Sequence, residues 1–169
     1  MAKVCKNMKE LEKELLNRIN IALDEDVADV VKNVMTDHIL QDVYDARPEG
    51  AYVRRYNQSG NDINSPFDDT DNTGLLDPNT IIATIDGDGG LKVENVTLGS
   101  KYYYKDGEKK TSQNAGKPIA EVIETGEGYD IANIKPRPFM ENTAEDIKEH
   151  NYHIQALKDG LKKLGLEVK

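Results

Sequence analysis

The stretch Val43-Tyr44-Asp45-Ala46-Arg47-Pro48-Glu49-Gly50-Ala51-Tyr52-Val53-Arg54-Arg55-Tyr56 decides the fold, because the hydrophobic period of the chain changes there. The proline of the Arg47-Pro48 pair has a fixed φ and no N–H, and it pushes the residue before it out of the α region. Glu49-Gly50 then favours a turn, and Ala51–Tyr56 is rich in residues that prefer extended backbone. We therefore expect helices before this joint and strands after it.

Helical periodicity dominates the chain before the joint. Apolar residues recur there at steps of three and four, with charged residues between them, which is typical of an amphipathic helix. They are Met8, Leu11, Leu15, Ile19 and Ala22. The acids Asp24-Glu25-Asp26 favour the start of a second helix toward Asp42. A single long helix bent at the acids would show the same pattern, and we favour two helices within about 7–46.

Short strands are expected after the joint, over about 51–105. Asn57–Thr73 has almost no apolar residues and reads as a polar insertion between strands. Thr80–Ile85 and Leu91–Leu98 are strand candidates, and the run Asp86-Gly87-Asp88-Gly89-Gly90 between them is a hairpin signal. The aspartates of that run are explained by turn chemistry and need no metal.

The chain continues with a third strand candidate, Lys101–Lys105, and with a polar segment, Asp106–Ala115, that we expect to be loose. A short helix over about 117–125 follows, with Pro118 in its first turn and Gly126 at its end.

A last amphipathic helix is expected over about 143–164, with Thr143 and Asp146 as a capping pair. This order of elements predicts an α+β fold. N-terminal helices and a C-terminal helix would pack on a small antiparallel β-sheet in one domain, residues 1–169.

Composition limits the function. The 169 residues can bury a core, but only 37% are hydrophobic and 31% are charged, so some segments must pack poorly or become ordered on partners. A net charge of −9 argues against a protein that grips nucleic acid. The single cysteine, Cys5, favours a reducing cytoplasm. We expect no signal peptide and no membrane span.

The best metal candidate is the acidic loop Asp69–Thr80. Six residues fall at positions one, three, five, six, eight and nine of a calcium-binding EF-hand loop. They are Asp69, Asp71, Thr73, Gly74, Leu76 and Asp77. Thr80 occupies the twelfth position, where a bidentate glutamate is required. A solvated acidic loop therefore explains the pattern better, and a calcium-dependent binding module remains an alternative.

The sequence contains few features of a catalytic site. His38 lies on the apolar face of a predicted helix, where a packed and satisfied role is expected. His150 and His153 are three residues apart, but no third ligand completes a zinc site. Nucleophile motifs and phosphate-binding glycine loops are missing from the sequence. We expect no catalytic residue, no metal and no cofactor; a hydrolase with unrecognised carboxylates is the weakest alternative.

Tyr52, Arg54 and Tyr56 would share one face of a strand. Tyrosine and arginine are both enriched at protein interfaces, which favours a subunit contact. A solvated sheet face on which arginine stems cover tyrosines is the simpler alternative.

Several motifs follow one another in an order that resembles a known family. They are Val43-Tyr44-Asp45, Tyr52-Val53-Arg54-Arg55-Tyr56, Gly74-Leu75-Leu76-Asp77, Ile123-Glu124-Thr125-Gly126-Glu127-Gly128-Tyr129 and Arg137-Pro138-Phe139-Met140. The chain resembles, over about Leu11 to Leu164, the tail-completion proteins of long-tailed bacteriophages, also described as head–tail joining or neck proteins. The segments Asn57–Thr73 and Asp106–Ala115 look like expansions of that pattern.

The resemblance implies a non-enzymatic virion protein, made in the bacterial cytoplasm. Its subunits would form a ring, expected to be a hexamer, that contacts head-closure or adaptor proteins and tail-terminator or tail-tube proteins. Double-stranded DNA would pass through the lumen without specific binding. Arg137 and Phe139 would join Tyr52, Arg54 and Tyr56 at interfaces. A tail terminator or a head-closure protein is the neighbouring alternative.

We further hypothesise that part of the negative charge faces the channel or the outer solvent, with Asp62–Asp77 as the candidate region.

Overall fold

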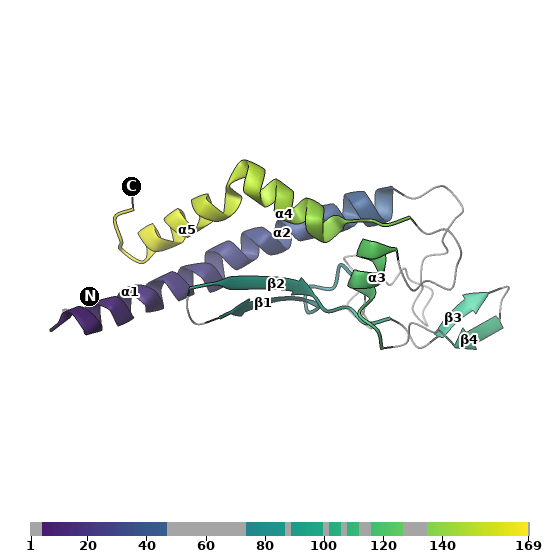
Figure 1. The fold of residues 1–169 in the computed structure, drawn as a ribbon, viewed down its shortest axis with the longest axis horizontal. Helices are drawn as coiled ribbons and strands as arrows, with labels where there is room; N and C mark the ends of the chain where they lie inside the picture. Colours follow the sequence, from purple (N-terminus) through teal and green to yellow (C-terminus); the bar gives the residue numbers. More distant parts are fainter. Residues whose placement is uncertain are drawn as a thin grey trace. The chain divides into compact units, whose positions relative to one another are not determined.

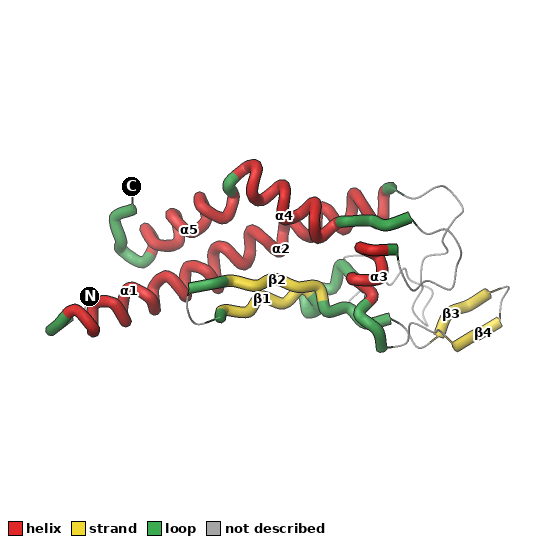
Figure 2. Tube along the Cα trace, in the orientation of Figure 1, coloured by secondary structure: helices red, strands yellow, loops and turns green. Residues whose placement is uncertain are grey.

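The computed structural model confirms the α+β class, with helices and two small antiparallel sheets (Figures 1 and 2). Contacts group the chain into two compact units. Unit 1 comprises Met1–Val34, Ala83–Val93 and Glu145–Lys169, and unit 2 comprises Met35–Ile82 and Glu94–Ala144. The expectation of one domain stays a prediction. The structure describes residues 5–46, 74–86, 89–99, 102–105, 108–111, 116–126 and 135–168.

The N-terminal helical region differs from the two helices that we expected. α1 (Met8–Ala22) continues directly into a π-helical turn, η1 (Leu23–Val27), and then into α2 (Ala28–His38) and a second π-helical turn, η2 (Ile39–Asp45). The acids Asp24-Glu25-Asp26 lie within η1. They therefore mark a widened turn and do not break the helix, because a π turn accommodates an extra residue while the backbone stays helical.

In unit 1, α5 (Tyr152–Lys163) packs on α1 and η1. Gly160 is buried at this contact, and a Cβ there would lie 3.0 Å from the Ala22 Cβ and would collide with the Asp26 carboxylate. Lys163 forms an ion pair with Asp26 beside it. The glycine thus permits a close approach that no larger residue would allow.

The end of α5 is fixed by a Schellman motif. Gly165 adopts φ 81°, and the Leu166 N–H donates to the Leu161 carbonyl at 2.9 Å. The Arg18 guanidinium of α1 donates to the Leu164 carbonyl at 3.0 Å. These bonds satisfy carbonyl groups that the helix end leaves without a helical partner.

The C-terminal region contains two helices where we expected one. α4 (Phe139–His150) starts four residues before the predicted boundary, and Asn151 separates it from α5. Asn151 has φ 56°, a left-handed conformation that asparagine tolerates better than most residues. The predicted capping role of Thr143 is wrong, because Thr143 is buried inside α4 and its hydroxyl donates to the Phe139 carbonyl at 2.6 Å.

The first hairpin matches its prediction. β1 (Ile81–Ile85) pairs with β2 (Leu91–Asn95), and Gly89 in the connection has φ 87°. In unit 1, Gly89 lies close to the α1 side chains Leu16 and Ile19, where an added Cβ would be 3.8 and 3.9 Å from them.

A second hairpin corrects the expectation of a loose segment after Lys105. β3 (Tyr102–Lys105) pairs antiparallel with β4 (Glu108–Thr111), and Tyr102 lies opposite Thr111. The strand candidate Lys101–Lys105 is thus confirmed for its described residues, and part of Asp106–Ala115 is a strand.

The larger core belongs to unit 2. Helix α3 (Ile119–Thr125) ends at Gly126, which has φ 72°, as the sequence predicted. The buried apolar residues described in this unit come from α2, η2, the turn before β1, β1 itself, α3 and α4. They are Met35, Ile39, Val43, Leu75, Leu76, Ile81, Ile119, Ala120, Ile123 and Phe139. No helix in the described part of the chain is long and apolar enough to cross a membrane.

Candidate functional site

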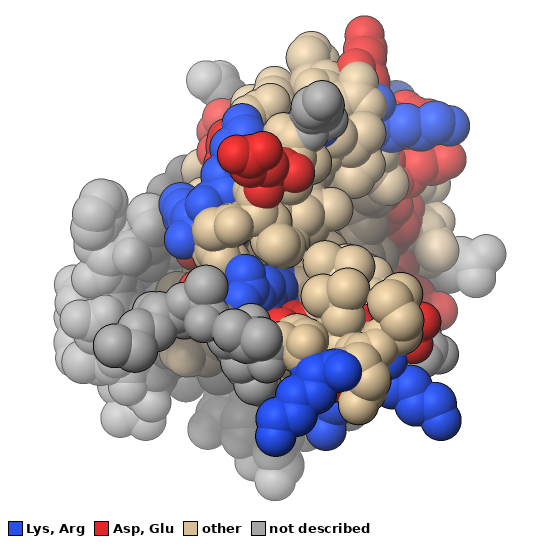
Figure 3. Space-filling view, turned by 90° about the vertical axis from the view of Figure 1, so that its left-hand side faces the viewer, with Lys and Arg blue, Asp and Glu red and all other residues tan. Residues whose placement is uncertain are grey.

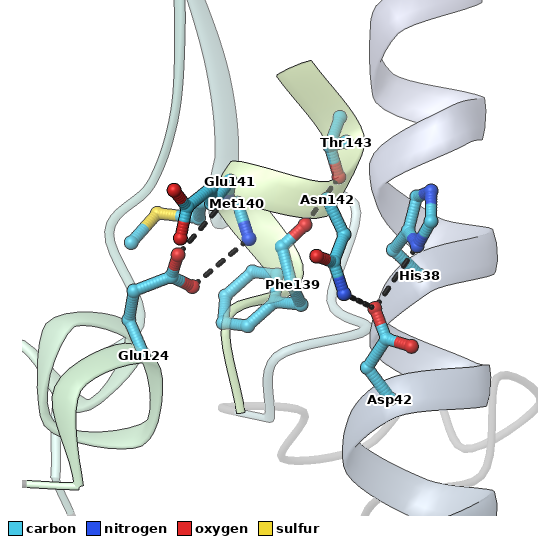
Figure 4. Close-up of polar contacts among 8 residues, drawn as sticks. All are labelled: His38, Asp42, Glu124, Phe139, Met140, Glu141, Asn142 and Thr143. Carbon is cyan, nitrogen blue, oxygen red and sulfur yellow. Dashed lines mark hydrogen bonds and ion pairs between the residues drawn. The ribbon is translucent and has the colours of Figure 1, made fainter. Parts of the chain in front are cut away.

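Four of the motifs that the sequence analysis singled out lie in unit 2, and three of them meet at the start of α4 (Figure 4). The three contributors are the end of η2, the end of α3 and the segment Arg137–Met140. We call their contact region the α4 junction.

Glu124 of α3 caps the start of α4. One carboxylate oxygen accepts the Met140 N–H at 2.9 Å, and the other accepts the Glu141 N–H at 3.0 Å. Pro138, directly before the helix, has no side-chain oxygen that could serve this purpose. Because the first N–H groups of a helix lack helical partners and carry partial positive charge, a carboxylate placed there stabilises the helix start.

Asp42 of η2 receives two hydrogen bonds at one oxygen. His38 Nδ1 and the Asn142 side-chain amide each donate to Oδ2 at 2.9 Å. A carboxylate can only accept, so Nδ1 carries the proton of this pair. The expected packed and satisfied role of His38 is confirmed by this contact.

Arg137 and Phe139 serve the interior of unit 2. The Arg137 guanidinium donates to the Val43 carbonyl at 3.0 Å, and its backbone N–H donates to the Ile123 carbonyl at 3.0 Å. Phe139 has 0% exposed surface. Phe139 is therefore a core residue of unit 2, and its expected place at an interface stays a prediction. An additional interface role for the half-buried Arg137 stays a prediction.

The motif Gly74-Leu75-Leu76-Asp77 forms a buried turn before β1. The Asn95 side-chain amide donates to the Leu75 carbonyl at 2.8 Å, and the Thr97 hydroxyl donates to the Gly74 carbonyl at 3.2 Å. Asn95 and Thr97 are both buried. The motif thus serves the packing of unit 2.

The same turn includes the end of the calcium-loop candidate. The Asp77 carboxylate accepts the Asn79 N–H at 2.8 Å, and the Thr80 hydroxyl donates to the Asp77 carbonyl at 2.8 Å. Leu76 is buried. Asp69, Asp71 and Thr73 lie outside the described residues. Within the described part of the chain, no group of three His, Cys, Asp or Glu side chains is arranged to hold a metal ion.

His150 and His153 lie on different helices, because Asn151 separates them. His150 Nδ1 lies 2.7 Å from an Asp146 carboxylate oxygen, and His153 Nδ1 lies 3.3 Å from the Ile147 carbonyl. The hydrogen bond to the Asp146 backbone carbonyl, together with the Asp146 carboxylate, raises the pKa of His150 above its usual 6.5. The two rings therefore have separate partners.

Tyr52, Arg54 and Tyr56 lie outside the described residues, as do Asn57–Thr73 and the hypothesised channel-facing aspartates before Gly74. Glu124, Asp42 and Asn142 were not predicted to meet at one helix start. Pro138 offered one signal, because a helix that starts after a residue without a capping side chain needs an acceptor from elsewhere in the chain.

The α4 junction is thus built from capping groups and core residues. The YomN family model matches residues 7–163, and the chain belongs to the YomN family. It is 26% identical over 174 residues to the SPbeta prophage-derived uncharacterized protein YomN of Bacillus subtilis (strain 168), and the alignment covers 99% of each chain. No solved structure matches the chain. The expected connection with bacteriophages is supported at the level of this prophage-derived relative.

Proposed function

We propose that this protein is a structural subunit of a bacteriophage neck, of the tail-completion or head–tail connector type. Copies of the chain would form a homo-oligomeric ring, with a hexamer as the expected stoichiometry. The ring would join the tail terminator or tail tube to head-closure or adaptor proteins, and double-stranded DNA would pass through it.

One observation carries the proposal: the alignment with a prophage-derived protein covers 99% of both chains. Because the match spans nearly the whole chain and not one segment, it supports a phage origin for the whole chain. The order of motifs, which resembles tail-completion proteins, narrows the phage role to the neck.

The contacts of those motifs agree with a structural role. Glu124 caps a helix, Arg137 binds a helix-end carbonyl and Phe139 fills the core. Side chains in such positions stabilise the fold. We therefore propose a non-enzymatic virion component that is made and assembled in the bacterial cytoplasm.

The charge of the chain suits a channel for DNA. A net charge of −9 disfavours tight contact with phosphates, because such contact requires basic groups that displace counterions. DNA would then move through the ring without specific binding.

Native mass spectrometry of the purified protein tests the proposal. The protein would be measured alone and mixed with tail-tube, tail-terminator and head-closure proteins. We expect a ring of defined mass that binds at least one protein from each side. A protein that stays monomeric with every partner would contradict the proposal, and a ring that binds only tail proteins would indicate a tail terminator.

A further inference from the structure

The β3–β4 hairpin lies within unit 2 and combines aromatic with basic residues (Figure 2). Its strands read Tyr102-Tyr103-Tyr104-Lys105 and Glu108-Lys109-Lys110-Thr111. They contain three lysines and one glutamate, whereas the whole chain has a net charge of −9. In the sequence, Lys101 before β3 and Asp106 in the connection offset each other. The hairpin is therefore locally basic in an acidic protein.

The register of the hairpin divides its residues between two faces. Residues directly opposite each other share a face, and neighbours along one strand lie on opposite faces. Tyr102, which pairs with Thr111, therefore shares a face with Tyr104, which pairs with Lys109. We call these four residues the tyrosine face, and none of them is acidic.

The one glutamate of the two strands lies on the other face. Glu108 is directly opposite Lys105, and Lys110 is opposite Tyr103 on the same face. Opposite charges at directly paired positions attract each other across an antiparallel pair. Glu108 is thus placed to offset Lys105, and the tyrosine face keeps its positive charge without a neighbouring acid on its own side.

The tyrosine face differs from the helical surfaces in this respect. On α1, Lys9 and Lys13 stand among Glu10, Glu12 and Glu14. On the side of the protein that Figure 3 shows, acidic and basic side chains both occur beside uncharged ones. A polyanion would meet carboxylates as well as lysines on such surfaces.

The hairpin also stands apart from the other elements. Among the described helices and strands, β3 and β4 have extensive contacts only with each other. No described helix is therefore packed along the tyrosine face, which leaves it available to a partner from outside the chain.

We infer that the tyrosine face contacts the phosphate backbone of double-stranded DNA. Lysine, tyrosine and threonine side chains all donate hydrogen bonds to phosphate oxygens. A two-stranded β-ribbon also fits the width of the DNA major groove. Neither described strand contains an arginine, asparagine or glutamine, which form paired hydrogen bonds with base edges. The contact is therefore independent of DNA sequence.

The inference rests on the proposed function, because the DNA that passes through the ring supplies the partner. Each hairpin would bind weakly, since only one lysine lies on the tyrosine face and the chain as a whole is acidic. Repetition of the hairpin around a ring would add these weak contacts together. DNA would be guided by the hairpins and would remain free to slide.

Fluorescence anisotropy with a labelled DNA duplex of mixed sequence tests the contact. The protein would be used in the assembly that native mass spectrometry establishes, with neck partners present if the ring requires them. Wild type should bind at low salt and lose affinity steeply as the salt concentration rises, because phosphate contacts release counterions. Lys109→Gln should weaken binding about fivefold at low salt and make the salt dependence shallower.

Two controls remove the same charge elsewhere. Lys110→Gln acts on the other face of the hairpin and Lys13→Gln acts on α1, and each should weaken binding by less than about twofold. Circular dichroism would establish that all variants are folded.

The tyrosines are tested without loss of their rings. Tyr102→Phe with Tyr104→Phe removes two hydroxyl donors and should weaken binding about threefold. Tyr103→Phe, on the other face, is the matched control and should leave the affinity unchanged.

Three outcomes would overturn the inference. A wild-type ring that binds no duplex at low salt would remove the DNA contact and leave the proposed function standing. Equal effects of Lys109→Gln and Lys110→Gln would show that the tyrosine face is not the contact. Unchanged DNA affinity together with lost binding to a neck partner would make the hairpin a protein contact. Failure of the proposed function would be seen separately, as a protein that stays monomeric with every partner before any DNA is added.

Discussion

The side-chain amide of Asn142 donates a 2.9 Å hydrogen bond to the carboxylate of Asp42, one hundred positions earlier in the chain. This bond ties the first turn of α4 to η2 within unit 2. His38 donates to the same carboxylate oxygen, so two donors depend on one acceptor. The start of α4 is thereby fixed by contacts that are distant in sequence.

Removal of the shared acceptor, the Asp42 carboxylate, should destabilise the protein. We expect Asp42→Ala to lower the free energy of unfolding by about 2–3 kcal/mol, because two partly buried donors lose their partner. Asn142→Ala should cost about 1 kcal/mol. Urea unfolding of both single variants and of the double variant measures these values.

The double variant should be less destabilised than the sum of the single variants, since the two side chains interact directly. Gln41→Ala, an exposed change on the same turn, serves as the control. Strict additivity of the two single effects would show that the bond contributes nothing in solution.

Glu124→Ala should destabilise the protein by about 1–2 kcal/mol, because two N–H groups at the start of α4 lose a charged cap. Chemical denaturation gives the value, and Glu121→Ala on the exposed side of the same helix is the matched control. Equal stability of the two variants would argue that water replaces the cap without cost.

Gly160→Ala tests two opposing effects on the stability of the protein. Alanine has a helix propensity about 1 kcal/mol better than glycine, so an exposed position would gain stability. At residue 160 the added Cβ would collide with Asp26 and crowd Ala22. We expect a net loss of about 1–3 kcal/mol by thermal or urea unfolding. Lys158→Ala, on the same helix, should change stability little, and a stabilised Gly160→Ala variant would contradict the close packing.

The pKa of His150 should be measurably raised. Its hydrogen bond to the Asp146 carbonyl and the Asp146 carboxylate favour the protonated ring. NMR titration should therefore give a midpoint above 6.5, and Asp146→Asn should lower it. Glu145→Gln should leave the midpoint unchanged.

The raised pKa of His150 determines the direction in which protein stability changes with pH. A raised folded-state pKa contributes stability below pH about 6.5, and this contribution is lost as the pH rises through the folded-state pKa. His150 is exposed, so the effect on unfolding should be small. An unshifted midpoint would show that the pair with Asp146 does not persist in solution.

Local chemistry made part of the fold predictable. Pro118 and Gly126 bound α3 because proline suits a helix start and glycine suits a left-handed helix end. The glycine-rich connection between β1 and β2 predicted a hairpin, because its residues tolerate the positive φ that a tight turn requires. Such signals depend only on residues that are neighbours in sequence.

The α4 junction was not predictable in this way. The helix starts at Phe139 because Glu124 and Asp42 supply acceptors from other elements. Thr143 looked like a cap, whose oxygen would accept a hydrogen bond from a helix N–H. Within α4, its hydroxyl instead donates to the Phe139 carbonyl. Sequence spacing cannot show contacts of this kind, since they depend on which elements meet in space.

The π-helical turn η1 has a consequence for how relatives of this protein can vary in length. A π turn holds one residue more than an α-helical turn, while the helix on either side continues. Deletion of one residue within Leu23–Val27 should convert the widened turn into a regular one and keep the flanking apolar faces aligned. Deletion of one residue in the middle of α1 would instead rotate everything before it by about 100°. Gaps between family members should therefore collect at η1 and spare α1.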